Sequence, residues 1–260
     1  MKISVSSLAF TGPFFCDMAE LPKDVGIEIF CEWGSDGYWE KAVPFVMDGR
    51  TGNFSMHAPF EYYDLSSPHE DGDALISYLT SRFALYKKLG SDSYVIHTNE
   101  MYPSDITDEE IAVRQKTAEA RLLKLDRIAK DAGVRMLVEN LGWGISGRTL
   151  YDQESFTDLF RRHPELDCII DVGHAIVEHF DVEALQKELG SRVRAYHLHN
   201  NDGLHDSHRH LRDGVYDYAK FVRNAKKYTP DATLVLEYAY AGSVAEVADD
   251  IDYLKSLLRE

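Results

Sequence analysis

The sequence predicts a (β/α)8 TIM barrel, a single α/β domain with an eight-stranded parallel sheet over residues 1–260. Short apolar strands alternate with longer amphipathic segments from one end of the chain to the other, which is the order of elements in such a barrel. Most of these strands are continuous apolar runs, as expected when both faces of a parallel sheet are buried. No break in composition divides the chain, so we expect one domain.

The boundaries of the elements carry recognisable signals. Thr107 with Glu110 and Ser243 with Glu246 have the spacing of capping boxes at helix starts. The first two units lack a clear helical pattern, which predicts an irregular start. We expect strands at 2–6, 25–30, 53–57, 93–97, 134–139, 167–171, 193–199 and 233–238. We expect helices near 73–89, 108–132, 153–162, 182–189, 215–228 and 243–258.

Composition and charge narrow the class of protein. The formal charge of −16 disfavours nucleic acid and anionic membrane surfaces as partners. Cys16, Cys31 and Cys168 show no ligand spacing and form no even-numbered set, which favours a reduced, cytoplasmic protein. The amino-terminal residues resemble a first strand and not a signal peptide, and no stretch reaches transmembrane length. Membrane association is therefore not expected, and the sequence leaves the oligomeric state open.

Ionisable side chains close one predicted strand after another. Because the carboxyl ends of barrel strands form one face, these residues are expected to meet there. A polar residue that ends a buried strand is costly without a partner, so a shared metal ion is expected. The strand-ending residues are His57, His97, Glu139, Asp171, His199 and Glu237.

The segment after the seventh strand is rich in further candidate ligands. Residues 197–214 contain five histidines and three aspartates. His197 and His199 lie two apart on a strand and point to the same side. Asp206 and His208 add a carboxylate and an imidazole, and His174 follows Asp171 closely enough to reach the same volume. Imidazole and carboxylate ligands without thiolates suit Mn²⁺, Zn²⁺, Co²⁺ or Fe²⁺.

These motifs resemble those of the xylose-isomerase-like TIM-barrel superfamily, which contains sugar isomerases and epimerases and the endonuclease IV type of apurinic-site nuclease. The resemblance spans nearly the whole chain, and its motifs are MHAPF, VENLGWG, DVGHA, HLHNNDG, DSH and LEYA. The chain departs from the nuclease pattern after His97, where Thr-Asn-Glu replaces the usual Pro-Gly, and at Arg212, where a glycine is common.

The resemblance implies a metal-binding quartet and a set of additional ligands. The quartet of the isomerase and epimerase branches matches Glu139, Asp171, His199 and Glu237, and His174 matches a histidine near the substrate. The additional ligands of the nuclease branch match His57, His97, His174, Asp206 and His208. A divalent ion (Mn²⁺, Zn²⁺ or Co²⁺) is implied, with one ion favoured and two or three compatible with the residues.

The loops of the expected active face favour a small carbohydrate over nucleic acid. Segments 31–41, 58–73, 98–110 and 200–214 contain 16 Asp/Glu against 3 Lys/Arg, whereas nucleic-acid sites usually carry Lys and Arg. Arg148, Arg209 and Arg212 remain candidates for binding a substrate phosphate. Aromatic rings beside polar groups suit a sugar. The aromatic residues are Trp33, Tyr38, Trp39, Phe60, Tyr62, Tyr63 and Trp143.

We therefore expect a metal-dependent sugar or sugar-phosphate isomerase or epimerase. Its ion would stabilise an enediolate, Glu139 and Glu237 would exchange protons on opposite faces of the carbon, and His174 would orient a substrate hydroxyl. One alternative is a multinuclear zinc phosphodiesterase of the endonuclease IV type. Another is a barrel that binds a sugar without turnover, because fold alone does not fix function.

Overall fold

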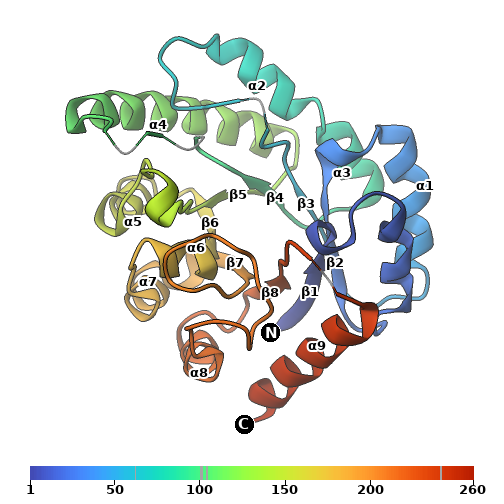
Figure 1. The fold of residues 1–260 in the computed structure, drawn as a ribbon. Helices are drawn as coiled ribbons and strands as arrows, with labels where there is room; N and C mark the ends of the chain where they lie inside the picture. Colours follow the sequence, from blue (N-terminus) through green and yellow to red (C-terminus); the bar gives the residue numbers. More distant parts are fainter. Residues whose placement is uncertain (62, 100–101, 104, 241) are drawn as a thin grey trace.

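A computed structural model describes residues 1–61, 63–99, 102–103, 105–240 and 242–260, and it shows a closed barrel of eight parallel strands in chain order (Figure 1). This confirms the predicted TIM barrel. The strands are β1 Lys2–Ser6, β2 Gly26–Phe30, β3 Phe54–His57, β4 Tyr94–Ile96, β5 Met136–Glu139, β6 Asp167–Asp171, β7 Val193–Leu198 and β8 Thr233–Leu236. Their bounds lie within two residues of the predicted ones.

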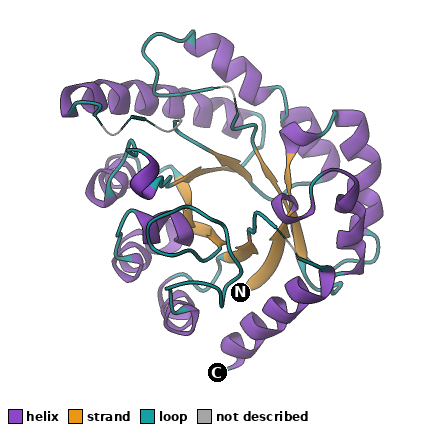
Figure 2. Ribbon diagram, viewed as in Figure 1, coloured by secondary structure: helices purple, strands orange, loops and turns teal. Residues whose placement is uncertain are grey.

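Helices surround the barrel and cover the outer face of the sheet (Figure 2). They are α1 Asp36–Met47, α2 Gly72–Thr80, α3 Phe83–Leu89, α4 Asp108–Asp131, α5 Gln153–Arg162, α6 Val172–Val177, α7 Val182–Leu189, α8 Tyr218–Tyr228 and α9 Val244–Arg259. Five short 3₁₀ segments join them within the described chain, at Ser7–Phe10, Gly12–Glu20, Cys31–Trp33, Gly144–Ser146 and Gly190–Arg192. Among the described helices, none combines the length and apolarity needed to cross a membrane.

Local sequence signals explain where the long helices start and stop. Thr107 and Glu110 form the predicted capping box of α4, in which each side chain accepts from the backbone of the other residue. Ser243 accepts from the Glu246 backbone at the start of α9. Gly90 and Gly133 follow α3 and α4 with φ of 70° and 71°, a conformation that glycine adopts without strain.

Two expectations about the helices were wrong. The segment predicted as one helix at 73–89 is divided into α2 and α3, because the chain turns at Ser81, whose hydroxyl donates to the Tyr78 carbonyl. The second unit is not weak in helix, since α1 forms over twelve residues with Ser35 as its N-cap. The first unit is irregular, as predicted, and contains 3₁₀ turns in place of a helix.

Along β4–β7, the inside of the barrel shows two layers that differ by a step of two residues. Side chains alternate along a strand, so a residue and the second residue after it point to the same side. The lower layer is an apolar cluster of Val95, Leu137, Ile169 and Ala195. The layer above it, two residues later on the same strands, consists of His97, Glu139, Asp171 and His197. Every residue of this upper layer except His97 is fully or almost fully buried.

Candidate metal centre

The ionisable side chains predicted from the sequence meet at the carboxyl end of the barrel. Within the described residues they form three adjoining groups, in each of which the possible ligand atoms lie within 4.8 Å of one another. The central group comprises Glu139, Asp171, His197 and Glu237. The first outer group comprises His57, His97 and Glu139, and the second comprises His174, His199, Asp206 and His208.

The central group is arranged around the ring of His197. Its Nδ1 atom lies 3.0 Å from Oε1 of Glu139, 3.4 Å from Oε2 of Glu237 and 3.8 Å from Oδ2 of Asp171. The strand register explains this convergence, because Asp171 on β6 pairs directly with His197 on β7. Three buried carboxylates around one imidazole nitrogen carry a negative charge that a cation would offset.

The first outer group shares Glu139 with the central group. Oε2 of Glu139 lies 3.4 Å from Nε2 of His57 and 3.2 Å from Nε2 of His97. The His57 ring stacks on Phe30 at a centroid distance of 4.2 Å, which holds the imidazole edge toward the carboxylate. Glu139 is therefore a possible ligand in both groups.

The second outer group is built by the loop after β7 and by the start of α6. Oδ2 of Asp206 lies 3.4 Å from Nε2 of His174 and 3.1 Å from Nε2 of His208. Asp171 caps α6 by accepting from the His174 backbone, which places that ring beside the barrel mouth. The His199 and His208 rings stack at 3.7 Å. This group is thus a continuation of the central one.

The residues present fit divalent ions. Several polar atoms of these groups are buried without any hydrogen-bond partner in the described part of the chain, a costly state unless an ion or a ligand occupies the space between them. The donor set of carboxylates and imidazoles matches zinc, manganese or cobalt. The unpartnered atoms are Oε2 of Glu139, Oε1 of Glu237, Nδ1 of His199 and Oδ1 of Asp206.

Burial and neighbouring charges shift the pKa values of the central residues in different directions. Burial raises the pKa of Glu237 to about 7, although His197 and His208 oppose this. Burial also acts to raise the pKa of Glu139, but His197 and His97 outweigh it and hold this pKa well below its usual range. Burial lowers the pKa of His97 to about 4. Two carboxyl groups whose pKa values differ in this way suit the two roles of acid and base.

The histidine of the quartet inferred from the resemblance, His199, lies in the second outer group, next to the central one. Its Nε2 atom is 3.0 Å from Oδ1 of Asp171, and it groups with His174, Asp206 and His208. His197, which the expected ligand set omitted, lies in the same layer as Glu139 and Asp171. The two histidines point to the same side of β7 but lie two residues apart, so they belong to different groups.

Glu28 on β2 is a second residue that sequence reasoning missed. It is buried below the central group, and its carboxylate contacts His197 and Ser55 at 2.8 Å each. The available signal was a glutamate inside the apolar strand GIEIF. The pattern of strand-ending residues excludes it, because Glu28 lies two residues before the end of its strand.

Some of the predicted aromatic residues are buried and pack in the interior, whereas others are partly exposed beside the site. Trp39 is buried in α1 and donates from Nε1 to the Cys31 carbonyl, and Tyr63 is also buried. Trp33 stacks on Phe30 at 4.7 Å and meets Phe60 edge-on at 6.2 Å. Tyr62 lies outside the described residues. The partly exposed rings of Trp33 and Phe60 therefore border the His57 side of the centre.

The three arginines considered for phosphate binding are already paired with carboxylates. Arg148 contacts Asp108, and Arg212 contacts both Asp249 and Asp250. Arg209 lies 3.8 Å from Asp202. These pairs leave little unpaired positive charge for a phosphate group.

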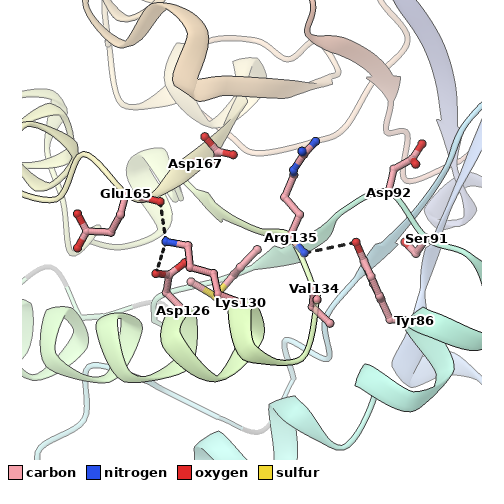
Figure 3. Close-up of a pocket in the computed structure, with 11 residues that line it drawn as sticks. Tyr86, Ser91, Asp92, Asp126, Lys130, Val134, Arg135, Glu165 and Asp167 are labelled. Atoms are coloured by element: carbon pink, nitrogen blue, oxygen red, sulfur yellow. Dashed lines mark hydrogen bonds and ion pairs between the residues drawn. The ribbon is translucent and has the colours of Figure 1, made fainter.

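A separate hollow of about 480 Å³ lies at the amino end of β5 and β6 (Figure 3). Lys130 crosses it and donates to Asp126 and to the Glu165 carbonyl, while the Arg135 backbone N–H donates to Tyr86. This end of a TIM barrel usually serves stability. We therefore place the functional site at the opposite end.

Comparisons with known proteins agree with the fold. Residues 47–257 match the family model described as "Xylose isomerase-like TIM barrel". The uncharacterized protein MJ1311 of Methanocaldococcus jannaschii is 24% identical over 256 residues, which cover 91% of this chain and 83% of that protein.

Solved structures show the same architecture. A D-tagatose 3-epimerase-like protein superimposes with a TM-score of 0.83 at 21% identity, covering 100% of this chain and 97% of the other. The TTHB071 protein of Thermus thermophilus, soaked with zinc chloride, gives a TM-score of 0.70 at 23% identity, covering 99% and 98%.

Proposed function

The chain belongs to the xylose isomerase-like TIM barrel family, and from this premise we propose that it is a metal-dependent sugar isomerase or epimerase. The observation that carries the proposal is the pair of buried carboxylates, Glu139 and Glu237, which lie 3.0 and 3.4 Å from Nδ1 of His197. Each has one oxygen without a hydrogen-bond partner within the described chain. A similar structure is named as D-tagatose 3-epimerase-like, which supports the same reaction class.

The two glutamates are the proposed acid and base. Glu139 takes the proton from the carbon next to the substrate carbonyl, and Glu237 returns one, or the reverse for the opposite epimer. His174, held near Asp206, orients a substrate hydroxyl. Glu139, Asp171, His197 and Glu237 would hold a divalent ion, which would supply Lewis-acid chemistry for the substrate carbonyl.

The surroundings of the centre favour an unphosphorylated sugar. Arg148, Arg209 and Arg212 face carboxylates, so they offer no free cationic cradle. Trp33 and Phe60 present ring surfaces that suit the C–H face of a sugar. The proposed substrate is accordingly a small ketose or aldose with adjacent oxygens.

Deuterium exchange tests this proposal across a panel of sugars. Protein loaded with Mn²⁺, Co²⁺ or Zn²⁺ is incubated in D₂O with unphosphorylated ketohexoses, ketopentoses and aldoses, and NMR records deuterium at the carbon next to the carbonyl. We expect exchange with at least one sugar, and none with Glu139→Gln. Failure of every sugar to exchange in metal-loaded protein would overturn the proposal.

A second candidate is a zinc phosphodiesterase with two or three ions. The observation in its favour is the pair of outer groups, because His57, His97, Asp206 and His208 exceed what one ion needs. Several ions can polarise a phosphate and activate water. The acidic loops and paired arginines weigh against a nucleic-acid substrate.

Metal content and a nuclease assay separate the two candidates. Protein purified without chelator should contain about one ion per chain if it is the isomerase. Two or three zinc ions, together with cleavage of a duplex oligonucleotide carrying an apurinic site, would select the phosphodiesterase. A protein that binds no metal would overturn both.

A further inference from the structure

Glu28 lies outside the three possible ligand groups, yet it contacts the residue at the centre of one of them. Its Oε1 atom is 2.8 Å from Nε2 of His197, and its Oε2 atom accepts from the Ser55 hydroxyl at 2.8 Å. Glu28 is fully buried and Ser55 nearly so. Both oxygens of this carboxylate are therefore committed to neighbours below the metal centre.

The two nitrogens of His197 face different surroundings. Nε2 points down toward Glu28, whereas Nδ1 points up toward Glu139, Asp171 and Glu237. A carboxylate only accepts hydrogen bonds, so the short contact to Glu28 requires a proton on Nε2. Nδ1 lies 3.0 Å from Oε1 of Glu139, so without an ion this nitrogen donates as well and the ring carries protons on both nitrogens. An ion in the central group would take the place of the Nδ1 proton and leave the Nε2 proton on Glu28.

We infer that Glu28 is a positioning residue, which holds His197 with its proton on Nε2 and so presents Nδ1 to an ion in the central group. The ring cannot turn over to expose Nε2 without losing the contact to Glu28. Partners of this kind, beyond the direct ligands, fix the tautomer and orientation of metal-binding histidines. The inference rests on the proposed function, because it needs an ion at this place.

Ser55 in turn orients the carboxylate of Glu28. Its hydroxyl donates to the oxygen of Glu28 that does not contact His197, and β2 and β3 pair directly at Glu28 and Ser55. The carboxylate is thus oriented from the neighbouring strand. Removing the Ser55 hydroxyl should loosen Glu28 while leaving its charge and its contact to His197 in place.

Zinc affinity measured by competition with a chromophoric chelator tests this role on wild type, Glu28→Gln and Ser55→Ala. In Glu28→Gln the amide can present either its oxygen or its NH₂ to Nε2, so the proton is no longer fixed there. We expect zinc binding to weaken by about 10–100-fold, the range typical of such partners. Ser55→Ala should give a smaller loss. Unchanged affinity in Glu28→Gln would overturn the inference.

NMR of ¹⁵N-histidine-labelled wild type loaded with zinc gives a second test that needs no variant. The expected ring of His197 carries its proton on Nε2 and binds zinc through Nδ1. A ring protonated on Nδ1, or one that does not respond to zinc while the protein binds it, would overturn the role of Glu28 alone. Wild type that binds no zinc would overturn the proposed function as well.

Discussion

The two layers inside the barrel use the same strands for opposite purposes. The lower layer fills the barrel with Val95, Leu137, Ile169 and Ala195, whereas two residues later the chain places His97, Glu139, Asp171 and His197. The lower layer contributes to folding through burial of apolar surface. The upper layer buries ionisable groups at a cost to folding, which is reasonable only if they serve binding or catalysis.

The largest expected effect comes from removing the shared carboxylate of the upper layer. Glu139→Gln keeps the shape of the side chain but removes a proposed base and a possible bridge between two groups. We expect kcat to fall by about 10³-fold or more, in line with the loss of a general base together with a metal ligand. Steady-state kinetics measures this, with circular dichroism to verify the fold. Near-normal kcat would contradict the assignment.

A matched substitution in the lower layer should lower the stability of the protein and leave ion binding nearly unchanged. Leu137→Ala removes buried methyl groups two residues before Glu139 on the same strand. We expect a loss of about 2–5 kcal/mol in the free energy of unfolding, with little change in ion affinity. Urea denaturation and chelator competition measure the two quantities. A large loss of ion affinity at unchanged stability would remove the distinction between the layers.

A substitution of Glu237 tests how much a buried carboxylate of the metal centre lowers the stability of the ion-free protein. Its pKa is raised to about 7 by burial, so the folded state disfavours the carboxylate. A raised acid pKa costs stability as pH rises from the unfolded value through about 7. Glu237→Gln should therefore raise the melting temperature of ion-free protein at about pH 8 and have little effect at about pH 4. Calorimetry at both pH values checks this, and a lower melting temperature at the higher pH would refute it.

A smaller, graded effect is expected from pH on ion binding. Burial acts to lower the pKa of His208, but Asp206 and Glu237 outweigh it and raise it to about 9. His208 also faces the rings of His174 and His199. Because an ion must displace its proton, affinity at the second outer group should rise as pH increases from about 6 to 9. Calorimetric zinc titrations in buffers of different ionisation enthalpy would report the protons released, and none released near neutral pH would count against this group as a site.

The fold and most of the centre could be predicted from the sequence, since strand-ending residues lie on one face of a parallel barrel. Helix α1 was missed because Gly37 and Pro44 weaken its helical pattern, although Ser35 caps it. Glu28 was missed because the pattern considered only strand ends. The strand pattern could not separate His197 from His199, because both point to the same side of β7. The pairing of β6 with β7 sets His197 opposite Asp171, while Nε2 of His199 also lies 3.0 Å from Asp171. Pairing register is a three-dimensional property that a strand pattern does not contain.

Anomalous diffraction at the zinc edge, from crystals of zinc-loaded protein, tests the central claim most directly. The upper layer is predicted to hold an ion between Glu139, Asp171, His197 and Glu237, with Nδ1 of His197 as the imidazole ligand. Further peaks in the outer groups would raise the ion count and favour the phosphodiesterase. Absence of a peak at the central group, with its carboxylates bridged only through a protonated His197, would contradict the account.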